Sequence, residues 1–292
     1  MQFLLQQLFW GAVLPATITF VLLLVSWRAW RREGAPTHWG IPLALAAGYL
    51  FAHWRILGLP LGFPPVDANE WLFVVAIAAG AWGFAEHTLA SRRLLRDIGR
   101  AILVAVVSWL VLRPLMGGVW QGSAAYLWWL SLALGWWLWW SLQERLAERV
   151  PGLPLPLVLS MVAGGGGFVL LWSNSSSLSQ LSGAVAAVVG ALVPLVWWRR
   201  DGRLGAGGVA WTAGVLGLIW VNAVAFVPVP LWRIGALVVA SLTPAVALLP
   251  AWRQRPVWGT LAACALLTAV VLAAVMFPTY RAYVASASAY GY

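Results

Sequence analysis

The sequence predicts an all-α fold, a polytopic transmembrane helix bundle of about ten spans. Three observations lead to this prediction: long apolar runs, very few charges, and arginines gathered between the runs. The 292 residues are 62% hydrophobic and 9% charged, with a mean hydropathy of +0.86. Because about a quarter of the residues in soluble domains are charged, the whole chain, 1–292, is expected to form a single integral membrane domain.

The apolar runs follow one another along the chain with short connections between them. An α-helix needs about 20 residues to cross the hydrocarbon core, so each run near that length is a predicted span. In chain order the predicted spans are residues 8–27, 39–57, 71–90, 101–120, 124–142, 154–173, 179–198, 207–227, 231–250 and 257–277. The first is expected to be retained rather than cleaved as a signal peptide, since no basic residue precedes it.

Arginine clusters follow every second span. They are Arg28, Arg31 and Arg32; Arg92, Arg93, Arg96 and Arg100; Arg145 and Arg149; Arg199, Arg200 and Arg203; and Arg253 and Arg255. With ten spans all of these lie on one side, and the positive-inside rule makes that side cytoplasmic. Both termini are then non-cytoplasmic, in a bacterial inner membrane. The net charge of +10 comes largely from these clusters, so the bilayer is the expected partner and nucleic acid is not.

Four consecutive glycines interrupt the sixth predicted span, and two interpretations remain open. Either they let neighbouring helices approach to backbone contact, which is favoured, or they form an unwound break that lines a transport cavity. These residues are Gly164, Gly165, Gly166 and Gly167. Ser160, Pro15, Asn222 and Thr243 are further candidates for helix packing or for lining a cavity.

Two ionisable residues in or near the spans are candidate intramembrane charges, Glu86 and Arg113. Their predicted depths differ too much for a salt bridge between them. Glu86 is therefore expected to be an interfacial carboxylate balanced by Arg92 or Arg93. Arg113 is expected to extend toward the outer headgroups.

Cofactor binding has one candidate in the sequence. His38 and His87 are predicted at similar depth, where two imidazoles have the capacity to ligate a haem, whereas His53 lies toward the other surface. Bound lipids are the more general expectation. No phosphate-binding loop, nucleophile elbow, zinc signature or carboxylate pair is present in the sequence, so no enzymatic activity is predicted.

Tryptophan is unusually frequent, with 23 residues. Most lie near predicted span ends, where an aromatic belt at the headgroups accounts for them. Trp136 and Trp137 lie deeper and are expected to pack between helices, or against a lipid or pigment.

The ten predicted spans divide into two sets of five, residues 1–150 and 151–280, followed by a short non-cytoplasmic tail, 281–292. An odd number of spans in each half gives the halves opposite orientations, as in an inverted repeat. In this layout the chain resembles the drug/metabolite transporter superfamily, which implies a central substrate cavity, but members of that family keep both termini cytoplasmic. The stretches 112–115 (LRPL) and 177–184 (SLSQLSGA) are similar to those of uncharacterised bacterial multi-pass proteins, a likeness that implies no site.

Two functions from different classes follow. In the first, the protein is a non-catalytic integral membrane subunit or scaffold of a larger membrane complex. In the second, it is a small-molecule secondary transporter with a midplane cavity at the sixth span. The scarcity of charge at the midplane favours the first, because ion-coupled transport normally needs an intramembrane carboxylate.

Overall fold

The computed structural model describes residues 6, 8–29, 40–60, 62–89, 92–150, 152–198, 203–227, 229–253 and 256–289. Within these ranges every regular element is helical. The elements are η1 (Phe9–Val13), α2 (Leu14–Ala29), α3 (Gly40–Leu57), α4 (Trp71–Thr88), α5 (Arg93–Met116), α6 (Gly122–Arg149), α7 (Pro154–Leu171), α8 (Ser176–Gly190), α9 (Leu192–Trp198), α10 (Gly205–Phe226), α11 (Leu231–Ser241), η3 (Thr243–Leu248), α12 (Pro250–Arg253) and α13 (Val257–Ala289).

Eight of the described helices are long and apolar enough to cross a membrane, and the apolar part of α4, Trp71–Glu86, forms a shorter one. This confirms the predicted multi-pass helix bundle, and each of the ten predicted ranges overlaps a helix. The 28-residue α6 is not among the eight. Its many tryptophans lower its mean hydropathy, and its last two turns carry acidic and basic side chains.

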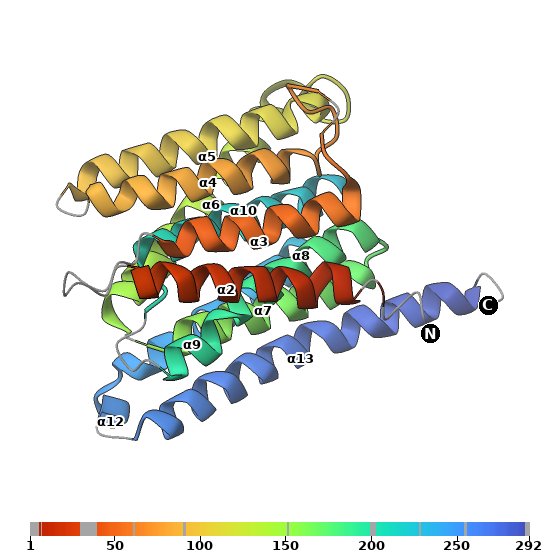
Figure 1. The fold of residues 1–292 in the computed structure, drawn as a ribbon. Coiled ribbons are helices and arrows are strands. Elements are labelled where there is room, and N and C mark those ends of the chain that lie inside the picture. Colours follow the sequence, from red (N-terminus) through yellow and green to blue (C-terminus); the bar gives the residue numbers. More distant parts are fainter. Residues whose placement is uncertain are drawn as a thin grey trace.

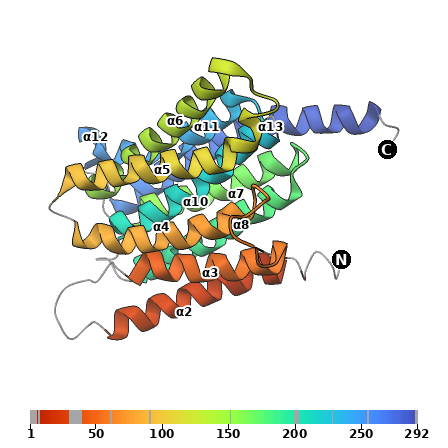
Figure 2. The ribbon, with the colours of Figure 1, turned by 90° about the horizontal axis from the view of Figure 1, so that it is seen from above.

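The long helices lie roughly side by side, and the bundle has two distinct ends (Figure 1). The end of α4, the start of α5 and α12 lie at one end, and α13 finishes at the other (Figures 1 and 2). Helix α10 is the most enclosed of the candidate spans, with 83% of its apolar window buried. Its small residues make this position possible, because they allow close approach from several sides.

Glycine pairs bring helix backbones into direct contact around α10. A Cβ atom built at Gly83 of α4 would lie 2.6 Å from the carbonyl oxygen of Gly207 in α10, and a Cβ at Gly207 would lie 2.6 Å from the carbonyl oxygen of Gly83. The predicted packing residue Pro15 takes part in a similar contact between α2 and α3. Its carbonyl oxygen would lie 2.7 Å from a Cβ at Gly48.

The four glycines of the sixth predicted span lie inside one continuous α-helix, α7. The proposed unwound break is therefore wrong. A Cβ at Gly165 would lie 2.8 Å from Leu272 of α13, and a Cβ at Gly167 would lie 3.1 Å from the carbonyl oxygen of Ser179 in α8. A Cβ at Gly164 or Gly166 would meet its nearest neighbour only at 3.5 Å or more. The segment stays helical although glycine has a low helix propensity. Neighbouring helices pack closely against it, and this packing stabilises the helix.

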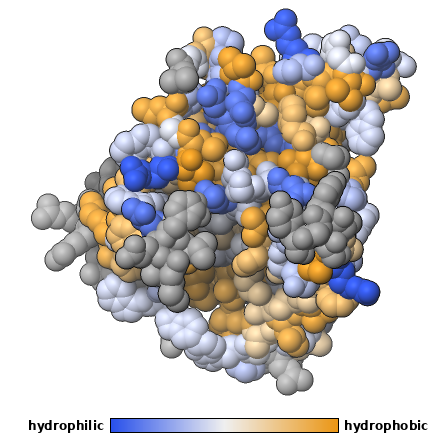
Figure 3. All heavy atoms as spheres, turned by 90° about the vertical axis from the view of Figure 1, so that its right-hand side faces the viewer, coloured by the Kyte–Doolittle hydropathy of each residue, from blue (hydrophilic) through white to orange (hydrophobic). Residues whose placement is uncertain are grey.

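The predicted tail from residue 281 does not form a separate segment, because α13 continues as a helix to Ala289. Its last turns extend past the neighbouring helices (Figures 1 and 2). Viewed from the end at which α13 finishes, the surface alternates between hydrophilic and apolar patches (Figure 3).

Several tryptophans lie in the interior rather than in an aromatic belt. Trp136 is 4% exposed, and its indole N–H donates to the carbonyl oxygen of Ala213 in α10 at 2.8 Å. Trp140 and Trp211 are fully buried. The large indole rings fill the space that the small residues of α10 leave open.

Candidate functional site

Four charged side chains from three helices form a buried cluster. Glu86 lies on α4, Arg96 and Arg100 on α5, and Glu144 on α6, and their exposed fractions are 1%, 6%, 0% and 5%. Two positive and two negative charges leave this ion-pair cluster neutral. Neutrality and pairing matter here because an isolated buried charge costs several kcal/mol.

Arg100 is the centre of the ion-pair cluster. Its Nε lies 2.5 Å from Oε1 of Glu86, and its Nη1 binds Oε2 of Glu144. Arg96 approaches the same Glu144 from the other side, with Nη1 at 2.7 Å from Oε1. Glu144 is therefore shared by two arginines, and the cluster connects α4, α5 and α6.

Aromatic rings complete the surroundings of the cluster. The indole N–H of Trp82 donates to Oε1 of Glu86 at 2.7 Å, and the Arg100 guanidinium lies 5.7 Å from the centre of the Trp140 ring. Gly99 makes room for this arrangement, since a Cβ there would collide with the Trp82 ring. These contacts surround the charges with apolar groups and hold Glu86 in place.

Local spacing explains how the sequence brings these groups together. Trp82 and Glu86 are four residues apart on α4, and Arg96 and Arg100 are four residues apart on α5, so each pair shares a helix face. The short connection between α4 and α5 makes the two helices antiparallel neighbours and brings the end of α4 beside the start of α5.

The partner predicted for Glu86 was wrong. Glu86 binds Arg100, while Arg93 pairs with Glu148 at 2.5 Å. Sequence reasoning also missed Glu144. The signal that was available is the repeated Glu-Arg pair at residues 144–145 and 148–149, which places both acids on one face of α6.

Three polar atoms of the cluster have neither a hydrogen-bond partner nor an ion-pair partner among the described residues: Glu86 Oε2, Arg96 Nε and Arg100 Nη2. The cluster is buried and neutral, and its ion pairs hold α4, α5 and α6 together as a buried clamp. Removing one member would leave its partners charged and unpaired, which is the costly case for a buried ion pair.

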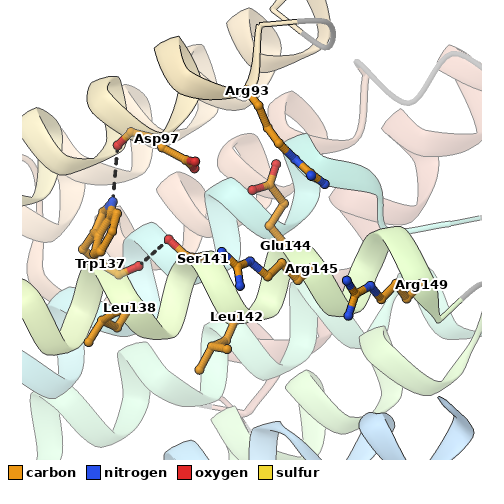
Figure 4. Close-up of a pocket in the computed structure, with 9 residues that line it drawn as sticks. All are labelled: Arg93, Asp97, Trp137, Leu138, Ser141, Leu142, Glu144, Arg145 and Arg149. Atoms are coloured by element: carbon orange, nitrogen blue, oxygen red, sulfur yellow. Dashed lines mark hydrogen bonds between the residues drawn. The ribbon is translucent and has the colours of Figure 1, made fainter.

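A pocket of about 370 Å³ lies between α5 and α6, next to the ion-pair cluster (Figure 4). Glu144 belongs to the cluster and also lines the pocket. Arg93 and Asp97 reach it from α5, and Arg145 and Arg149 reach it from α6. The pocket therefore lies at the arginine-rich ends of these helices. It combines guanidinium groups with the apolar side of α6.

The other predicted site residues are dispersed through the bundle. Ser160 donates to the carbonyl oxygen of Ala186 at 2.8 Å, which joins α7 to α8. Asn222 is 1% exposed and donates to the carbonyl oxygen of Ala68 at 3.0 Å. Each of these bonds holds neighbouring segments together, and the residues do not gather at one site.

Two further predicted residues have local surroundings of their own. Thr243 begins η3, and its hydroxyl lies 2.7 Å from that of Thr268 in α13. Arg113 is exposed near the end of α5, and no carboxylate within the described part of the chain pairs with it. Its exposure agrees with an arginine that extends away from the bundle.

The proposed haem ligands lie outside what the structure describes: His38 entirely, and His87 in its side chain. His53 is fully buried, with Nε2 3.1 Å from the carbonyl oxygen of Asn69. Within the described ranges, no three His, Cys, Asp or Glu side chains form a group suited to a metal ion.

Comparisons of this chain with protein-family models, with curated proteins and with solved structures found no match.

Proposed function

We propose that the protein is a non-catalytic integral membrane subunit or scaffold of a larger membrane complex. Its partners in this proposal are the lipid bilayer and other membrane protein subunits, and it acts by helix packing. The observation that carries the proposal is the C-terminal extension of α13, defined here as residues 281–289.

Helix α13 is longer than a membrane span requires. It has 33 residues, and at about 1.5 Å per residue it is roughly 50 Å long, against about 30 Å for the hydrocarbon core. Residues 280–286 are all exposed. Within the described part of the chain, Tyr280 is the last residue of α13 whose aromatic ring contacts the bundle. The centre of its ring lies 5.2 Å from that of Trp172.

The C-terminal extension presents apolar and aromatic side chains beyond that contact. Tyr283 and Val284 are 39% and 43% exposed. The extension continues α13, so it needs no helix nucleation of its own, but most helical stability in proteins comes from packing of an apolar face against a neighbour. A partner subunit that covers this face would stabilise the extension, which supports a scaffold function.

The transporter alternative placed a midplane cavity at an unwound break in the sixth span. Gly165 and Gly167 instead lie in a continuous helix against α13 and α8, which supports the packing interpretation. We therefore propose packing, rather than transport, as the function of these glycines.

Removing the C-terminal extension is expected to abolish co-purification of partner subunits without unfolding the bundle. A chain that stops after Tyr280 keeps the contact with Trp172, so its thermal midpoint should stay close to that of the full chain. The measurement is quantitative mass spectrometry of proteins that co-purify in mild detergent, beside thermal unfolding of the same samples.

Point variants sharpen this test. Tyr283→Ala with Val284→Ala should reduce partner recovery, whereas Leu266→Ala, at a 67% exposed position within the apolar part of α13, should leave it unchanged. Recovery of the same partners from the truncated and full-length chains would refute docking through the extension.

We also propose a ten-span topology in the bacterial inner membrane, with two five-span halves and both termini non-cytoplasmic. The helix order supports it, since the described helices allow five passages before residue 150 and five after it. The arginines that begin α5, end α6 and precede α10 support the orientation.

Single cysteines are expected to report this orientation. In a Cys264→Ser background, Asp67→Cys and Ser176→Cys should react with an impermeant thiol reagent in intact cells, whereas Arg203→Cys should react only after lysis. All three positions are exposed, so differences in labelling report the side of the membrane. Labelling of Arg203→Cys in intact cells would reverse the proposed orientation.

A further inference from the structure

We infer that the pocket between α5 and α6 binds the phosphate headgroup of an anionic phospholipid, with an acyl chain lying along α6. This inference does not depend on the proposed scaffold function. It rests on one stripe of α6 side chains that changes from apolar to basic along the helix.

The stripe consists of Leu138, Leu142, Arg145 and Arg149, all of which line the pocket. Their spacings of four, three and four residues place them on one face of the helix. The two leucines lie farther from the arginine-rich end of α6, and the two arginines lie toward it (Figure 4). A phospholipid has the same order of chemistry, with an apolar chain ending in a charged phosphate.

The charge balance leaves these two arginines available. Arg93 pairs with Glu148, and Arg96 and Arg100 share Glu144. Within the described part of the chain, no carboxylate forms an ion pair with Arg145 or Arg149. Both are exposed, so an anion can reach them, and guanidinium groups match phosphate oxygens well.

The apolar half of the stripe favours a lipid over a free anion. Leu138 and Leu142 are 47% and 42% exposed, so they are open to an acyl chain. Trp137 lies beside them in the pocket and donates its N–H to the carbonyl oxygen of Asp97 at 3.3 Å. A soluble phosphate would use the arginines and leave this apolar surface empty, whereas a lipid uses both.

Asp97 also lines the pocket, and its negative charge limits where a phosphate can bind. Its carboxylate lies 3.6 Å from Nη1 of Arg100, in the neighbouring ion-pair cluster. The phosphate is therefore expected on the side of Arg145 and Arg149, at a distance from the carboxylates of Asp97 and Glu144.

Lipid titration of the delipidated full-length protein tests this inference. Phosphatidylglycerol is expected to bind more tightly than phosphatidylcholine in native mass spectrometry and to raise the thermal midpoint more at equal concentration. In the double variant Arg145→Gln and Arg149→Gln, phosphatidylglycerol binding should weaken roughly 25-fold, since each basic group near anionic lipid contributes a factor of about five.

A matched control separates this site from general charge loss. The double variant Arg113→Gln and Arg203→Gln removes the same charge from exposed positions that do not line the pocket, and it should bind phosphatidylglycerol like the parent. Equal binding by the two double variants would refute the site.

Inorganic phosphate and Leu142→Ser distinguish a lipid from a free anion. We expect millimolar phosphate to leave the thermal midpoint unchanged, and Leu142→Ser to weaken phosphatidylglycerol binding although every arginine is retained. Stabilisation by phosphate equal to that by phosphatidylglycerol would overturn the assignment to lipid.

Discussion

Replacing Arg100 by alanine is expected to lower the free energy of unfolding by about 3–5 kcal/mol, a large effect for a single substitution. Arg100 is fully buried and binds both Glu86 and Glu144. Removing it leaves Glu86 without this cationic partner and leaves Glu144 with Arg96 alone. The measurement is unfolding in mixed detergent micelles.

A compensating variant tests whether the unpaired charge is the cause. Arg100→Met combined with Glu86→Gln removes one charge of each sign and keeps the pair between Arg96 and Glu144, so it should recover most of the lost stability. Arg93→Ala is the exposed control. Its side chain is 68% exposed in its pair with Glu148, so the loss should stay below about 1 kcal/mol. Equal losses for Arg100→Ala and Arg93→Ala would contradict a buried clamp.

The second large effect is expected where α4 and α10 touch through their backbones. Gly207→Ala would place a methyl group 2.6 Å from the carbonyl oxygen of Gly83, with Pro42 at 3.1 Å. Backbone atoms cannot rotate away as a side chain can, so the helices must separate. The expected loss is about 1–3 kcal/mol, together with a lower yield of monodisperse protein.

Gly83→Ala is the reciprocal test of this contact, since its Cβ would meet the carbonyl oxygen of Gly207 at 2.6 Å. Because either methyl group separates the same two helices, the double variant should lose less than the sum of the two single losses. Gly135→Ala in α6 is the control. Among the described residues, nothing outside the helix's own backbone lies within 4 Å of the position that its Cβ would take, so the better helix propensity of alanine should leave the protein equally or more stable. A Gly207→Ala protein as stable as the parent would refute the close contact.

The sequence by itself determined the class of the protein and the positions of its helices. Composition and the length of apolar runs can be read directly from the sequence. A chain that has long apolar runs and only 9% charged residues has few stable alternatives to membrane helices. Helix ends were less accurate. Helix α5 begins at Arg93 rather than at residue 101, because its first two turns carry the arginines of the ion-pair cluster. Helix α13 continues to Ala289 rather than ending near residue 277.

The tertiary structure decided which side chains meet. Glu86 was identified from the sequence as an unusual charge, but its partners depend on the rotation and depth of α5 and α6, which no local pattern specifies. The same holds for the glycines of α7 and for the central position of α10. In a soluble bundle, an apolar stripe on each helix would reveal its buried face. In a membrane the surrounding lipid is as apolar as the protein interior, so helices such as α10 are apolar all round, and only packing distinguishes the face that meets protein from the face that meets lipid.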